Sequence, residues 1–160
     1  MLVLVLLAGC ASPPAPSQPG VPRPAADAGT PPRPLSLESE RHWLQSWFAG
    51  TPVQIALRSD GALAVEVPRE FCFDAGRSAV KPALAAVLDK VAESLRRQRT
   101  ARLTLLAAPG DPAPNAGLAR QRAEQVRTHL RGRGVPESRL AASSNAVSAA
   151  VQLRLELPAP

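Results

Sequence analysis

Three polar residues lie where they could bind a small ligand that carries both an acid and an amine. Arg122 falls in a predicted helix that begins at Asn115, and Asp111 falls in the loop that leads into this helix. An arginine and the free N–H groups of a helix N-terminus can bind a carboxylate, while an aspartate can bind an ammonium. The three residues therefore predict a site for a zwitterion. A surface helix with solvated arginines would show the same spacing.

The helix after Asn115 is predicted from apolar residues that recur at three- and four-residue steps. These residues, which share one face, are Leu118, Ala119, Ala123, Val126 and Leu130. The predicted polar face carries Arg120, Arg122, Arg127 and Arg131. Gly132 and Gly134 can end the helix, because glycine is common just after a helix C-terminus.

Hydrophobic periodicity in the rest of the chain predicts strands that alternate with helices. The predicted elements are a helix at 36–48, strands at 53–58 and 62–67, a short strand through Phe71 and Phe73, a helix at 81–98, a strand at 102–107, the helix after Asn115, a short strand at 139–142 and a strand at 151–157. Strands that alternate with helices imply right-handed crossovers and helices packed on a sheet. We therefore predict an α+β fold with its helices on one small mixed sheet.

The composition limits the kinds of protein that this chain can be. Its 160 residues suffice for one domain, and 45% of them are hydrophobic but only 3% aromatic, so the core consists mainly of Leu, Val and Ala. The net charge of +6 suits anionic polymers or membrane surfaces without specifying either. No aromatic residues alternate with the arginines, so we expect no nucleic-acid partner.

Reactive groups are too scattered to predict an enzyme. The sequence has no Ser-His-Asp set in a sensible context, no glycine-rich phosphate loop and no cluster of metal ligands. We therefore expect no catalytic residue, no metal and no cofactor. Cys72 is predicted to be a small buried hydrophobic residue with no disulfide to Cys10.

An apolar run that ends in a cysteine opens the chain. Residues 1–10 are too few to span a bilayer, which needs about twenty apolar residues, but they fit an export signal. Leu7-Ala8-Gly9-Cys10 resembles the bacterial lipobox, in which the signal is cut before the cysteine and the sulfur receives a diacylglyceryl group. Residues 11–34 are rich in Pro, Ala, Ser and Gly, which is typical of a disordered spacer.

These features divide the chain into three parts. We predict a lipoprotein signal peptide at 1–9, a lipidated Cys10 with its linker through residue 35, and a folded domain at 36–160. By resemblance to the sorting rule of enteric bacteria, Ala11 favours the outer membrane, with the folded domain in the periplasm. The lipid anchor would then connect the protein to that membrane.

Three segments of the folded part are similar to motifs of one family. Residues 71–82 begin Phe-Cys-Phe-Asp and end Val-Lys-Pro, residues 115–123 read Asn-Ala-Gly-Leu-Ala-Arg-Gln-Arg-Ala, and residues 134–140 follow that helix. Together they resemble the OmpA C-terminal-like domain of peptidoglycan-associated lipoproteins. The chain looks like a divergent member of that family over roughly Val65 to Leu157. The implied fold is a β-α-β-α-β sandwich.

The resemblance implies non-covalent binding of peptidoglycan, through the free carboxylate and ammonium of diaminopimelate in the stem peptide. Arg122, Asn115 and Asp74 match the family's Arg, Asn and first Asp. The family's second Asp ends a Gly-His-Thr-Asp segment, which falls on residues 106–111 here. The Gly and His are absent and the following loop is shorter, so Asp111 takes that role only in a shifted alignment.

The predicted function is thus that of an outer-membrane lipoprotein that tethers the envelope to peptidoglycan. A single ion pair in water contributes little, so a zwitterion needs partners for both of its charges. The prediction therefore depends on Asp111 reaching the site. The alternative is a degenerate domain of the same fold that contacts other proteins in an envelope or secretion assembly.

Overall fold

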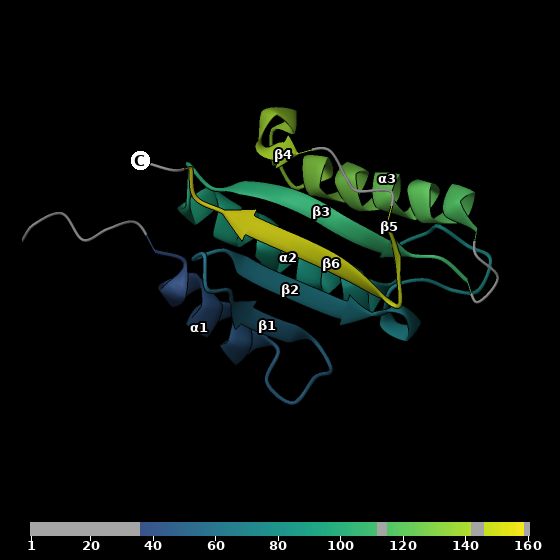
Figure 1. The fold of residues 1–160 in the computed structure, drawn as a ribbon, viewed down its shortest axis with the longest axis horizontal. Helices are drawn as coiled ribbons and strands as arrows, with labels where there is room; N and C mark the ends of the chain where they lie inside the picture. The colour runs from purple at the N-terminus through teal and green to yellow at the C-terminus, as the bar shows by residue number, and fades with distance from the viewer. Residues whose placement is uncertain (1–35, 112–114, 142–145, 159–160) are drawn as a thin grey trace, which may run out of the picture. The chain divides into compact units, whose positions relative to one another are not determined.

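One mixed β-sheet with helices against one of its faces organises the folded part of the chain (Figure 1). The computed structural model describes residues 36–111, 115–141 and 146–158. The predicted signal peptide at 1–9, Cys10 and the linker through residue 35 lie outside the described residues. No helix within the described ranges combines the length and the hydrophobicity that a membrane span requires.

The described elements follow the predicted order, except that η1 replaces one predicted strand and that η2 and β5 were not predicted. The helices are α1 (Glu38–Trp47), α2 (Pro82–Arg97) and α3 (Ala116–Gly132). The strands are β1 (Gln54–Leu57), β2 (Leu63–Pro68), β3 (Arg102–Pro109), β4 (Leu140–Ala141), β5 (Ala146–Ser148) and β6 (Ala150–Glu156). Two short 3-10 helices are η1 (Arg69–Phe71) and η2 (Glu137–Arg139).

The strand order places the last strand in the middle of the sheet. The order is β1-β2-β6-β3-β4, and β5 also pairs with β3. β6 is antiparallel to both of its neighbours, β2 and β3. β4 and β5 run parallel to β3, because α3 crosses over between them and returns the chain to the same end. The predicted mixed sheet is therefore confirmed.

Alternation along the central strands decides which face the helices cover. On β6, Val151, Leu153 and Leu155 are buried, and the residues between them are half-buried. Leu63, Val65 and Val67 alternate in the same way on β2, where Val65 lies opposite Leu153. These side chains form one hydrophobic cluster with the buried faces of α2 and α3. Figure 1 shows α2 lying behind β2 and β6.

Different helix and strand termini meet at the two ends of the folded part. β3 runs from the C-terminus of α2 to the N-terminus of α3, so one end collects the C-terminus of β3 and the starts of both helices. We call this the β3 exit. The opposite end collects the start of β3 and the C-termini of α2 and α3. α2 has 16 residues, which makes the two ends about 24 Å apart.

The strand predicted through Phe71 and Phe73 is wrong, because the chain coils into η1 there. The amides of Cys72 and Phe73 both donate to the carbonyl of Arg69, at 2.9 and 3.3 Å. Cys72 and Phe73 are neighbours in the sequence and both are buried, whereas successive residues of a strand point to opposite faces of the sheet.

The predicted burial of Cys72 is confirmed, and it raises the pKa of the thiol to about 12. The short strand β5 was not predicted.

A buried carboxylate fastens α1 to α2. Glu40 is 5% exposed, and it accepts hydrogen bonds from Ser94 Oγ at 2.8 Å, Arg97 Nη2 at 2.6 Å and Gln98 Nε2 at 3.3 Å. Burial opposes ionisation of Glu40, but the hydrogen bonds from Arg97, Ser94 and Gln98 outweigh it and hold its pKa below the ordinary value. The N-terminus of α1 therefore lies beside the C-terminus of α2.

We expect Glu40→Ala to lower the free energy of unfolding by about 1–3 kcal/mol, because the buried hydroxyl of Ser94 loses its acceptor. Urea denaturation of the variant and the parent measures this difference. Glu38→Ala is the matched control, since Glu38 is half-exposed and pairs only with neighbours on its own helix. Equal unfolding free energies for the two variants would contradict the role given to Glu40.

Candidate functional site

A buried arginine joins three segments at the β3 exit. Arg122 of α3 is 0% exposed, and its guanidinium donates to three main-chain carbonyls. Nε donates to Arg77 O at 2.9 Å, Nη1 to Pro109 O at 2.9 Å and Nη2 to Asp74 O at 3.0 Å. The guanidinium carbon also lies 4.9 Å from the centre of the Phe73 ring. Arg122 thus fastens α3 to the end of β3 and to the loop after Phe73.

The burial of Arg122 corrects its predicted place on the polar face of the helix. Arg122 lies three residues after Ala119 and four after Leu118, so its position belongs to the buried stripe. The charge of Arg122 predicts a position on the polar face, although its spacing from Leu118 and Ala119 places it on the apolar face. A buried arginine is tolerated here because carbonyl and carboxylate oxygens accept its N–H groups.

Asp111, which follows β3, lies directly against this arginine. Its Oδ1 accepts from Arg122 Nη2 at 3.0 Å, and its Oδ2 accepts from the amide of Gly76 at 2.7 Å. Gly76 has a φ of +68°, a conformation that favours glycine. The Gly76 amide and then the Arg122 guanidinium hold the pKa of the Asp111 carboxyl below its ordinary value. The Asp111 side chain keeps 26% exposure, so this carboxylate can meet a ligand.

The other two predicted site residues act at the same end in different ways. Asn115 caps α3, since its Oδ1 accepts from the amide of Leu118 at 3.0 Å. Asp74 gives its main-chain carbonyl to Arg122, while its carboxylate is 67% exposed and lies 3.5 Å from Lys81 Nζ. The structure therefore brings Asp111 and the main chain of Asp74 to Arg122. Asn115 orients the helix that carries this arginine.

A cavity of about 350 Å³ opens beside Asp111. Its lining residues are Arg69, Glu70, Phe73, Ala75 and Asp111. Arg69 is half-buried and Glu70 is exposed, and one guanidinium nitrogen of Arg69 lies 3.4 Å from the carbonyl of Gly110. The cavity therefore offers an accessible cation next to the carboxylate of Asp111.

Arg69 and Glu70 were not predicted as site residues. They belong to η1, which the sequence pattern did not indicate, and they are distant in sequence from Asp111. The amide of Arg69 donates to the carbonyl of Ala149 at 3.1 Å, which holds η1 against the start of β6. The only local signal was an adjacent cation and anion just after Pro68, and such pairs are common on surfaces.

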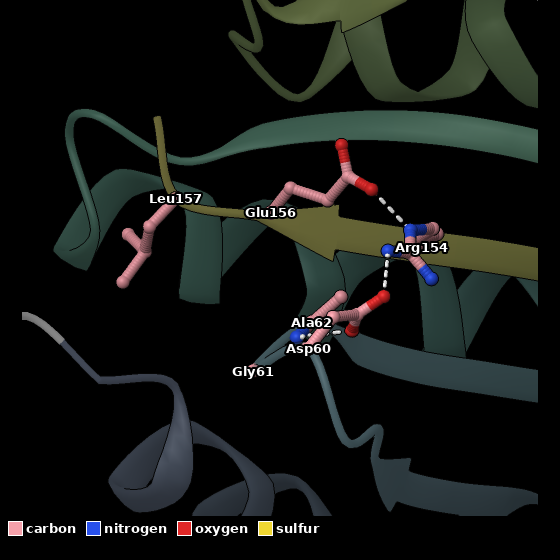
Figure 2. A pocket seen from close by; sticks show the side chains of 6 residues that line it. All are labelled: Asp60, Gly61, Ala62, Arg154, Glu156 and Leu157. Carbon is pink, nitrogen blue, oxygen red and sulfur yellow. Dashed lines mark hydrogen bonds and ion pairs between the residues drawn. The ribbon is translucent and has the colours of Figure 1, made fainter. Parts of the chain in front are cut away.

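A second cavity lies at the opposite end, between the β1–β2 turn and the end of β6 (Figure 2). It measures about 220 Å³ and contains Asp60, Arg154 and Glu156. Figure 2 shows Arg154 between the two carboxylates. Its guanidinium lies 2.6 Å from Asp60 Oδ2 and is also hydrogen-bonded to Glu156. These charges satisfy one another. A ligand would have to displace an existing ion pair, so we favour the cavity at the β3 exit.

The groups at the β3 exit suit binding of a zwitterion. Arg69 can donate hydrogen bonds from its guanidinium to a carboxylate, and the carboxylate of Asp111 can accept hydrogen bonds from an ammonium. Arg122 holds Asp111 in place, and the partly exposed carboxylate of Asp111 balances the charge of the buried guanidinium. Within the described ranges, no group of three His, Cys, Asp or Glu side chains is arranged to hold a metal ion. The expected absence of catalysis stays a prediction.

Comparisons with known proteins support one fold family. The sequence profile of the OmpA family matches residues 72–152. A comparison with curated protein sequences finds no match.

Several solved structures share the fold. A MotB-like protein from Desulfovibrio vulgaris has a TM-score of 0.61 at 18% identity, over 75% of this chain and 91% of that chain. The periplasmic domain of Helicobacter pylori MotB has a TM-score of 0.56 at 15% identity, over 69% of this chain and 83% of that chain. The cell wall anchor of the T6SS from Pseudomonas aeruginosa has a TM-score of 0.55 at 15% identity, over 79% of this chain and 99% of that chain.

We expect Arg122→Ala to lower the free energy of unfolding by about 3–5 kcal/mol, because three carbonyls and a carboxylate lose their buried donor. Thermal and urea unfolding of the purified protein measure this change. Arg120→Ala, on the exposed side of the same helix, should stay within about 0.5 kcal/mol of the parent. A parent-like stability of Arg122→Ala would show that the guanidinium does not hold the site together.

Proposed function

Since this chain belongs to the OmpA family, we propose that it binds peptidoglycan non-covalently through the cavity at the β3 exit. The observation that carries the proposal is the carboxylate of Asp111, clamped by Arg122 and Gly76 beside the accessible guanidinium of Arg69. The ligand group is the diaminopimelate of the stem peptide, which presents a free carboxylate and a free ammonium.

Each charge of this ligand group meets an opposite charge at the cavity. The ammonium binds the carboxylate of Asp111, with Glu70 as a second acid at the rim. The carboxylate binds Arg69, because the guanidinium of Arg122 is 0% exposed and already donates to four acceptors. Arg122 acts through Asp111, as a positioning residue. Asn115 and Asp74 shape the site through the helix cap and the main chain.

The hydrogen bonds that hold Asp111 in place strengthen its proposed contact with the ligand. A solvent-exposed ion pair contributes little when both side chains must be ordered on binding. Here the two hydrogen bonds from Arg122 and Gly76 order the Asp111 carboxylate beforehand. Binding therefore costs less conformational entropy than it would at two free surface residues.

The proposal includes a lipid anchor at Cys10. Residues 7–10 resemble a lipobox, and the spacer through residue 35 would connect a lipidated Cys10 to the domain. The anchor would lie in the outer membrane and the domain in the periplasm. This arrangement makes the protein a tether between that membrane and the peptidoglycan layer.

Cosedimentation of the full chain with purified diaminopimelate-type peptidoglycan tests the binding site. Arg69→Gln and Asp111→Asn should each weaken binding by about tenfold or more, because each removes one charge-assisted contact. Arg120→Gln is the control, since Arg120 is exposed on α3 away from the lining residues of the cavity. Melting temperatures accompany each measurement, so that loss of folding is recognised.

Two results would contradict the binding proposal. Undiminished binding by both Arg69→Gln and Asp111→Asn would place the ligand elsewhere on the domain. Absence of binding by the folded parent chain would favour the alternative function, in which the domain contacts other proteins of an envelope or secretion assembly.

The lipid anchor is tested by Cys10→Ser in a Gram-negative host. The variant should lose palmitate labelling and move from the membrane to the soluble periplasmic fraction, because no thiol remains to receive the diacylglyceryl group. Cys72→Ala is the matched control, since Cys72 is buried in the domain and its loss leaves the anchor intact. Membrane association that survives in Cys10→Ser would exclude anchoring at this residue.

A further inference from the structure

The end opposite the β3 exit carries a group of arginines that the peptidoglycan site does not use. We call it the arginine end, and its members are Arg96, Arg99, Arg102 and Arg139. Arg96 donates to the carbonyl of Arg133 at 3.3 Å. Arg139 donates to the carbonyls of Gln98 and Ala101, both at 2.6 Å. These contacts hold the segment between α2 and β3 against the segment that follows α3, so the four arginines lie at one end of the domain.

The arginine end carries an excess of positive charge. Across the described ranges, none of its four arginines forms an ion pair with a carboxylate. The nearby acids are engaged elsewhere: Asp89 pairs with Arg133, and Glu137 pairs with Arg127 and Arg131. Glu156 lies opposite Arg102 in the β3–β6 register but pairs with Arg154, as Figure 2 shows.

Two of these arginines have no structural task in the described part of the fold. Arg99 and Arg102 are exposed, and neither side chain makes a hydrogen bond to a described residue. Arg96 and Arg139, in contrast, satisfy carbonyls at the turns. An exposed guanidinium presents a planar set of donors that matches the oxygens of a phosphate.

We propose that the arginine end binds the anionic phospholipid headgroups of a membrane surface. The chain enters the folded part at this end, because Glu40 near the start of α1 contacts Arg97 and Gln98 at the end of α2. A domain tethered through its N-terminus is therefore attached at the arginine end. The peptidoglycan site lies at the other end, about 24 Å away along α2, so both surfaces can be occupied together.

The form of the arginine end favours headgroups over other anionic partners. Its arginines come from the last turn of α2, the turn that follows it, the first residue of β3 and η2, so several headgroups of one membrane surface can be bound at once. Residues 96–102 and 133–139 contain no aromatic side chain, which argues against stacking of single-stranded nucleic acid. Basic residues near an anionic leaflet add to binding in a salt-dependent way.

Vesicle cosedimentation of the full chain tests this proposal, with Cys10→Ser present in the parent and in every variant so that no lipid on residue 10 inserts into neutral and anionic vesicles alike. The probes are vesicles of phosphatidylcholine alone and vesicles of equal parts phosphatidylcholine and phosphatidylglycerol. The parent should bind the anionic vesicles more tightly, and added salt should reduce the difference. Arg99→Ser and Arg102→Ser should each weaken anionic binding by about fivefold, and the double variant by about twenty-five-fold.

Matched variants keep the test specific. Arg120→Ser removes the same charge from the exposed face of α3 and should change vesicle binding by less than about twofold. Arg99→Lys with Arg102→Lys keeps the charge and should retain most of the binding. The N-terminal residues are common to all variants, so differences among them report the arginine end.

Three outcomes would overturn the proposal. The first is equal binding of the parent to neutral and anionic vesicles. The second is a loss in Arg120→Ser as large as that in Arg99→Ser and Arg102→Ser. The third is unchanged vesicle binding by these two variants together with weaker peptidoglycan cosedimentation, which would assign the arginine end to the wall polymer instead.

Discussion

The buried guanidinium of Arg122 is the interaction on which the β3 exit depends. Three main-chain carbonyls from two separate segments accept hydrogen bonds from it, and the carbonyl of Pro109 needs this donor most because its hydrogen bond is buried. A guanidinium supplies several N–H groups in a fixed plane, so one side chain can serve them all. Its charge would be costly to bury alone, and Asp111 supplies the opposite charge at 3.0 Å.

This arrangement gives Asp111 two roles. It neutralises a buried cation, and it presents a carboxylate to the cavity with a pKa held below its ordinary value. The site is therefore part of what stabilises the domain. Arg122 has several buried contacts, so we expect its substitution to affect folding, whereas the Arg69 guanidinium makes one long hydrogen bond among the described residues and its substitution is the better test of the proposed binding.

The folded domain extends beyond the segment that the family profile matches. That segment begins at residue 72, yet β2 pairs with β6 along its whole length and covers one edge of it. α1 lies still earlier in the chain and is fastened to α2 by Glu40. α1 and β2 both contribute side chains to the hydrophobic cluster of the domain. They also bring the entry of the chain to the arginine end, away from the β3 exit.

Elements whose signals are local could be predicted from the amino-acid sequence. The alternation of Leu63, Val65 and Val67, the cap at Asn115 and the buried stripe of α3 depend only on neighbouring residues, so pattern and propensity found them. The partners of Arg122 and the position of Arg69 beside Asp111, in contrast, depend on contacts between segments that are far apart in the chain. The acceptors of Arg122 come from distant segments of the chain, and no local pattern records which carbonyls will converge around a side chain after folding.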